Sequence, residues 1–116
     1  MKRQFLMLEG VTKRARHEVT LDVRDAISSA GGWIIDQNFF SNIALAIRFV
    51  LPSRGLDELQ RCVTVAAVSL DDRSLAMLRQ TIEVSPTAET EITASLSITF
   101  SHNEPDLRQE IPAVPG

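Results

Sequence analysis

A helical pattern that runs into two glycines and is followed by two apolar runs constrains this chain more than any other feature. Val23, Ala26, Ile27 and Ala30 repeat at the spacing of one helix face. Gly31 then stands where helices commonly end with a left-handed residue. Residues 33–40 and 43–51 are rich in β-branched, aliphatic and aromatic side chains. The pattern therefore predicts a helix that leads into a β-hairpin.

Residue types predict where this helix begins and where the hairpin turns. Thr20 is the expected N-cap, because its hydroxyl can accept a hydrogen bond from a free amide at a helix start. Asp22 follows in the first turn, where the helix dipole favours a carboxylate. Ser41 and Asn42 separate the two apolar runs and favour a tight turn.

The remaining segments predict a first strand, further helices and a last strand. Residues 4–11 are apolar on both faces, which is typical of a central strand. Leu56, Leu59 and Val63 form the stripe of a second helix. Residues 63–68 are rich in β-branched side chains and could continue this helix or form a short strand; we extend the helix through them. Asp71 or Asp72 can cap a short third helix. Residues 92–101 alternate between apolar and hydroxyl-bearing or small polar side chains, so we expect a strand with one buried and one polar face.

This order of elements predicts an α+β fold. The arrangement β-α-β-β-α-β with short connections indicates a ferredoxin-like sandwich, a four-stranded antiparallel sheet with helices on one face. The last strand is then an edge strand that needs cover. We expect one domain over residues 1–103 and an extended tail over residues 104–116, whose three prolines exclude a continuous helix.

Composition excludes several classes of protein. A chain of 116 residues suits one domain, and its net charge of −3 argues against a nucleic-acid partner. No apolar run reaches the roughly 18 residues that cross a bilayer, and no secretory signal peptide is evident. We therefore expect a cytoplasmic protein with no membrane partner. The single cysteine, Cys62, allows no internal disulfide.

Two groups of polar residues are candidate binding surfaces. Arg14, Arg16 and His17 belong to a basic cluster that could hold a phosphate or carboxylate, or could simply be a solvated loop. Asp36 and Arg48 are expected on adjacent hairpin strands, where they can form a cross-strand ion pair. The sheet face that carries this pair is lined by small and polar residues, and is a candidate surface for a ligand or a second subunit.

Motifs for catalysis or metal binding are missing from the sequence. We find no phosphate-binding glycine loop, no Ser-His-Asp order and no paired-cysteine spacing. Cys62 lies in an apolar helical stretch, which favours a small buried hydrophobe over a nucleophile. His102 and the carboxylates after it match no metal signature. We therefore expect no catalytic residue, no metal and no cofactor.

The string DAISSAGGWIID at residues 25–36, with the apolar run at 43–51 and the helix start at 56–60, resembles the ACT domain family of small-molecule regulatory modules. The resemblance implies a ferredoxin-like fold, pairing of subunits and an amino acid or similar ligand. It places the ligand at the turn after the first strand, near Thr12, and at a subunit interface.

These observations leave three hypotheses for the function. The first is a non-enzymatic module that senses a small ligand or regulates a partner and acts as a homodimer. The second is a protein–protein interaction or assembly domain with no ligand. The third is a small ferredoxin-like enzyme with Arg14, Arg16 and His17 as its polar group. For the first, the candidate ligand-binding residues are Thr12, Arg14, Arg16, His17, Asp36 and Arg48.

Overall fold

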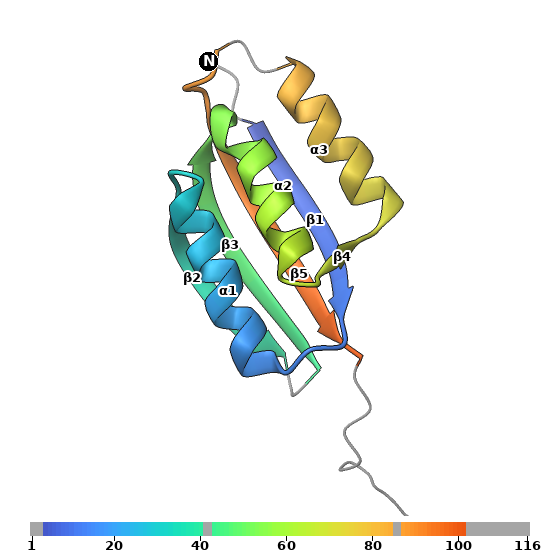
Figure 1. Ribbon diagram of the computed structural model, residues 1–116. Coiled ribbons are helices and arrows are strands. Elements are labelled where there is room, and N and C mark those ends of the chain that lie inside the picture. Colours follow the sequence, from blue (N-terminus) through green and yellow to red (C-terminus); the bar gives the residue numbers. More distant parts are fainter. Residues whose placement is uncertain (1–3, 41–42, 85–86, 102–116) are drawn as a thin grey trace, which may run out of the picture.

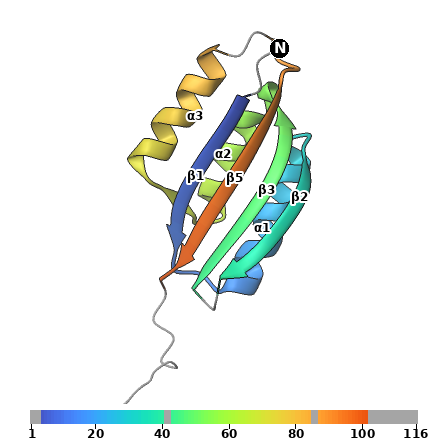
Figure 2. The same cartoon turned by 180° about the vertical axis from the view of Figure 1, so that it is seen from behind.

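The computed structural model describes residues 4–40, 43–84 and 87–101. The elements are β1 (Gln4–Thr12), α1 (Arg16–Ser29), β2 (Trp33–Phe40), β3 (Ala44–Pro52), the 3-10 helix η1 (Ser53–Gly55), α2 (Leu56–Val65), β4 (Ser69–Leu70), α3 (Asp72–Val84) and β5 (Glu91–Phe100). All three helices lie on one face of the sheet (Figure 1), and the view from behind shows the other face without a helix (Figure 2). The predicted α+β class and one-sided helix layer are thus confirmed.

Some predicted features fall outside the described residues. They are the turn at Ser41 and Asn42, the group that begins at His102, and the tail over residues 104–116. The hairpin itself is confirmed, because β2 and β3 pair antiparallel from Trp33↔Val50 to Phe40↔Ala44.

The sheet differs from the predicted ferredoxin-like arrangement in strand number, order and direction. It has five strands in the order β2-β3-β5-β1-β4. β5 lies between β3, to which it is antiparallel, and β1, to which it is parallel. The predicted four-stranded antiparallel sheet with the last strand at its edge was therefore wrong. The added strand β4 is only two residues long and pairs with the end of β1.

β5 occupies the middle of the sheet because it can bond on both sides and bury one face. Its apolar residues Ile92, Ala94, Leu96 and Ile98 are fully buried, as the alternation in the sequence predicted. They pack under the helices with the large buried residues of β1 and β3, among which Phe49 has no exposed surface. Covering this layer is the main hydrophobic contribution to folding.

α1 begins earlier than predicted and ends as predicted. Its first residue is Arg16, so Thr20 is not the N-cap and lies inside the helix, where its hydroxyl donates to the Arg16 carbonyl at 2.7 Å. The buried Val19 extends the apolar stripe by one turn, which explains the earlier start. Gly31 has φ of +89°, and its amide donates to the Ser28 carbonyl at 3.0 Å, so it ends the helix in the left-handed region.

The segment after α2 was only partly predicted. The helix ends at Val65, short of the predicted extension to residue 68, and Ala67 takes a left-handed φ of 66° before β4. The predicted cap of the third helix is confirmed, because an Asp71 carboxylate oxygen accepts from the Ser74 amide at 2.8 Å. The Ser74 hydroxyl in turn accepts from the Glu9 amide at 2.7 Å and ties α3 to β1.

Candidate functional site

The basic cluster predicted as a loop is divided between a short connection and the first turn of α1. Arg14 lies in the connection and donates to the carboxylate of Asp22 and to the Ala66 carbonyl, both at 2.8 Å. It also bridges to Glu18 at 3.3 Å. The Arg14 guanidinium therefore joins the start of α1 to the end of α2, and its hydrogen-bonding capacity is largely used within the fold.

Thr12 is also committed to the fold. It is 3% exposed, and its hydroxyl donates to the Ala67 carbonyl at 2.9 Å while accepting from the Arg14 amide at 3.2 Å. The Thr12 carbonyl accepts from the Ser101 amide at 2.8 Å. A buried hydroxyl with both a donor and an acceptor partner offers little to a ligand.

Arg16 and His17 take different surroundings in the first turn of α1. The Arg16 guanidinium lies 5.3 Å from the ring centre of Phe39, within the range of a cation–π contact. The His17 side chain is exposed. Arg14 and Arg16 are thus close in sequence but have separate partners.

Asp36 and Arg48 lie on the opposite face of the sheet from the helices. Arg48 donates from Nε to one carboxylate oxygen of Asp36 at 3.0 Å and from Nη2 to the other. These hydrogen bonds hold the pKa of the Asp36 carboxyl below its usual value. The predicted ion pair is therefore present. Because this pair lies on the other face of the sheet, the six candidate residues do not form one site.

The face that carries Asp36 and Arg48 is called here the open face, because no element within residues 4–40, 43–84 and 87–101 covers it (Figure 2). The strand registers arrange its side chains in four rows across β1, β5, β3 and β2. In that order the rows are Phe5-Thr93-Val50-Trp33, Met7-Ser95-Arg48-Asp36, Glu9-Ser97-Ala46-Asn38 and Val11-Thr99-Ala44-Phe40. None of these side chains is buried.

The open face is more apolar than the sequence analysis predicted. Phe5 is 53% exposed, Trp33 52% and Phe40 57%. The register of β2 slips between Ile34 and Asp36, so Ile35 is the extra residue of a β-bulge. The bulge brings Trp33 onto the same face as Asp36, although simple alternation puts them on opposite faces. The sequence did contain a signal for this apolar surface. β1 has apolar residues on both of its faces, and one helix layer can cover only one of them.

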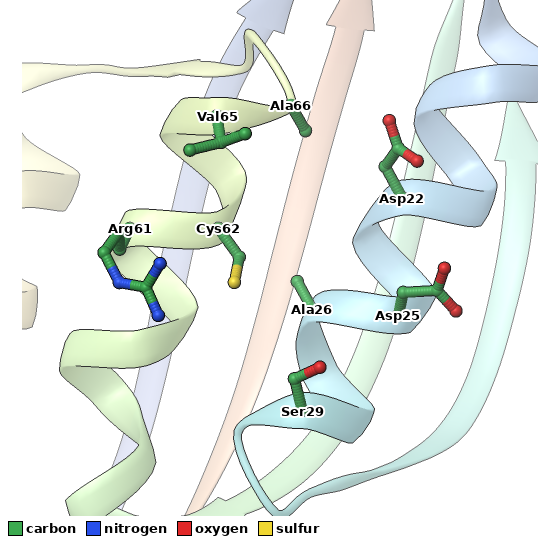
Figure 3. Close-up of a pocket in the computed structure, with 8 residues that line it drawn as sticks. All are labelled: Asp22, Asp25, Ala26, Ser29, Arg61, Cys62, Val65 and Ala66. Atoms are coloured by element: carbon green, nitrogen blue, oxygen red, sulfur yellow. The ribbon is translucent and has the colours of Figure 1, made fainter.

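A groove between α1 and α2 is a second candidate site (Figure 3). Its volume is about 270 Å³, and its lining comes from Asp22, Asp25, Ala26 and Ser29 on α1 and from Arg61, Cys62, Val65 and Ala66 in and after α2. The Cys62 thiol is 3.5 Å from a Glu58 carboxylate oxygen. Burial first, and then this carboxylate, raise the pKa of the thiol, which disfavours a nucleophilic thiolate.

Metal ligands are not gathered in the described part of the chain: it contains no cluster of three or more histidine, cysteine, aspartate or glutamate residues placed to hold an ion. Nor does any helix described here combine the length and apolar character needed to cross a bilayer. The cytoplasmic location stays a prediction.

Comparisons with protein-family models, with curated proteins and with solved structures found no match to this chain. The resemblance to the ACT family therefore rests on the sequence pattern alone and stays a prediction.

Proposed function

We propose that this chain is a non-enzymatic interaction module that binds another protein surface through its open face. The observation that carries this proposal is the exposure of Phe5, Trp33 and Phe40 on one continuous sheet surface. The rows place these three aromatic side chains at separate corners of the face, around a more polar centre. Aromatic residues are enriched in protein interfaces relative to the rest of the surface. This function is the second of the three hypotheses raised by the sequence.

The partners and positions of the polar candidate residues also favour an interaction module over a ligand sensor or an enzyme. The hydrogen bonds of Thr12 and Arg14 connect β1, α1 and the end of α2, and so stabilise the fold. An enzyme built on His17 would need that imidazole in a cleft beside a carboxylate. The groove between α1 and α2 does not include His17 in its lining.

Site-specific photo-crosslinking in cells that naturally express the chain tests the proposal. A photoreactive amino acid is placed at Thr99, which is exposed on the open face, and in a matched variant at Ser28, which is exposed on α1. We expect a covalent product with another polypeptide from position 99 and none from position 28. A silent position 99, or equal products from both positions, would contradict the proposal.

Sensing of a small ligand in the α1–α2 groove is a second candidate function. The groove is slightly smaller than the usual range of about 300–1,000 Å³ for ligand pockets, so it suits a compact molecule. Of the charged groups in its lining, Asp22 is paired with Arg14 and Arg61 with Glu58, so the carboxylate of Asp25 is the group that favours a ligand with an amine. A thermal-shift screen of amino acids and small amines tests this candidate. We expect a rise in melting temperature that Asp25→Asn abolishes; no rise with any amine would exclude sensing of this class.

A further inference from the structure

The order of side chains on the open face allows a second copy of the same surface to match it. We propose that a second copy of this chain covers the open face, sheet against sheet, about a two-fold axis that passes between the second and third rows. This inference rests on the proposed function, because it names the partner of the same surface.

The first and last rows are more apolar, and the second and third rows are more polar. The order of apolar and polar rows is therefore the same in either direction along the strands. The proposed axis lies in the plane between the two sheets and runs across the strands, parallel to the rows. It places the first row of one copy opposite the last row of the other, and each strand opposite its own counterpart. It sets Trp33 of each copy near Phe40 of the other, and Phe5 near Val11. A two-fold interface requires such self-complementarity, whereas an unrelated partner does not. The strand directions of two packed sheets differ by about 30°. A side chain of one copy can therefore also contact the row beside the one that it faces.

The two middle columns of the open face leave room for a second sheet. β5 contributes serine and threonine residues, and β3 contributes Ala44 and Ala46 beside Arg48 and Val50. The axis brings the long side chain of Arg48 opposite the small Ala46 of the other copy. Arg48 is already paired with Asp36 in its own copy, so the contact buries no unpaired guanidinium.

Charge also suits this arrangement. Glu9 is on β1, one of the two outer columns of the open face, and is exposed. In a face-to-face pair it lies at the rim, where its carboxylate keeps contact with water. Polar rims of this kind are usual in protein interfaces.

The open face approaches the size that a specific pair needs. Its four strands span about 19 Å across, and its four rows about 23 Å along the strands, at standard strand spacing and rise. This plane covers about 440 Å² per copy, and the relief of the side chains enlarges the accessible surface. Two copies then bury at least roughly 900 Å², close to the 1,000 Å² or so at which specific interfaces begin.

The first test measures self-association of the full, unmutated chain. Trp33 is the only tryptophan of the 116 residues, so its emission reports on this face alone. We expect light scattering to give twice the chain mass at high concentration. On dilution to a monomer, the Trp33 emission should shift to longer wavelength as the indole regains water.

A pair of matched variants then tests the surface. Ser97→Arg places a long cation in a middle column, within reach of Glu9 in the same row, so the fold can tolerate it. Ser28→Arg makes the same change at an exposed site on α1. We expect Ser97→Arg to weaken association by about 100-fold or more, because in each copy the long side chain fills the space that the small serine leaves for the second sheet. Ser28→Arg should change it by less than about twofold.

The outcomes separate this inference from the proposed function. A chain that stays monomeric, or a dimer equally sensitive to both variants or unaffected by Ser97→Arg, overturns the second-copy proposal. So does a monomer whose Trp33 emission is already shielded at every dilution, since the chain then covers its own face. If the second copy fails while position 99 still crosslinks to a different protein, the interaction module stands. If Ser97→Arg does not fold, by circular dichroism, the dilution series on the unmutated chain decides.

Discussion

Replacing Thr12 with valine separates a structural role of its hydroxyl from a ligand-binding role. Valine keeps the shape of threonine but can neither donate to the Ala67 carbonyl nor accept from the Arg14 amide. Because Thr12 is only 3% exposed, water cannot readily replace the lost partner. If the hydroxyl serves the fold, Thr12→Val should lower stability in the absence of any ligand.

The size of the effect follows from the two lost hydrogen bonds. Each group left without a partner in a buried site costs about 1–3 kcal/mol. Ala67 is exposed, so water can bond to its carbonyl and offset part of the free-energy cost of the lost hydrogen bond. The added methyl group returns up to about 0.8 kcal/mol of hydrophobic stabilisation. We therefore expect Thr12→Val to lower the free energy of unfolding by about 2 kcal/mol, or the melting temperature by about 6–10 °C.

Urea unfolding followed by circular dichroism measures this loss, with every variant at one protein concentration, since the proposed self-association would add stability. Thr64→Val is the matched control. The Thr64 hydroxyl bonds to the Gln60 carbonyl of its own helix and is exposed, so the change should stay within about 0.5 kcal/mol. If Thr12→Val is as stable as the control, the hydroxyl does not hold this corner of the fold, and a ligand role for Thr12 becomes the better explanation.

Three further predictions concern the backbone and the acid response. A Cβ on Gly55 would lie 2.1 Å from the backbone oxygen of Ala30, so Gly55→Ala should lower the free energy of unfolding by about 1–3 kcal/mol or more in a denaturant titration. Ala67→Gly should raise it by about 0.5–1 kcal/mol, since relief at φ of 66° exceeds the added entropy of the unfolded chain; an unchanged denaturation midpoint would contradict this. The depressed pKa of Asp36 means that its pairing with Arg48 adds stability above the ordinary aspartate value of 3.8, and that this is lost as the pH falls through the depressed value. Asp36→Asn should therefore flatten the loss of stability below about pH 4, and equal slopes for both proteins would refute this.

Local structure could be predicted from the sequence where it depends on neighbours in the chain. The stop at Gly31, the hairpin and the alternation in β5 each follow from a short pattern and a backbone rule. Strand order could not be predicted in this way. A pattern of alternating side chains shows that β5 has one buried face, but not which strands bond to its two edges.

The candidate surface was predicted in part. Asp36 and Arg48 were placed correctly on adjacent strands, because each side of the bulge keeps its own alternation. The bulge at Ile35 has no sequence signature, so the side of the sheet that Trp33 occupies could not be derived. Thr20 shows a related limit of residue types: a threonine that suits a helix cap can equally bond back to the carbonyl four residues earlier.

The central position of β5 has a consequence for how the sheet assembles. Gln4 pairs with Ile92, so the ladder between β1 and β5 joins residues that are far apart in the chain. Before β5 is synthesised, the hairpin of β2 and β3 has no ladder to β1, and the inner edges of β3 and β1 are both unpaired. Unpaired edges of this kind invite pairing with other chains. Contacts of such long sequence separation also slow folding. The nascent chain therefore carries two incomplete half-sheets until residues 91–100 emerge, and a single late strand closes both of them at once.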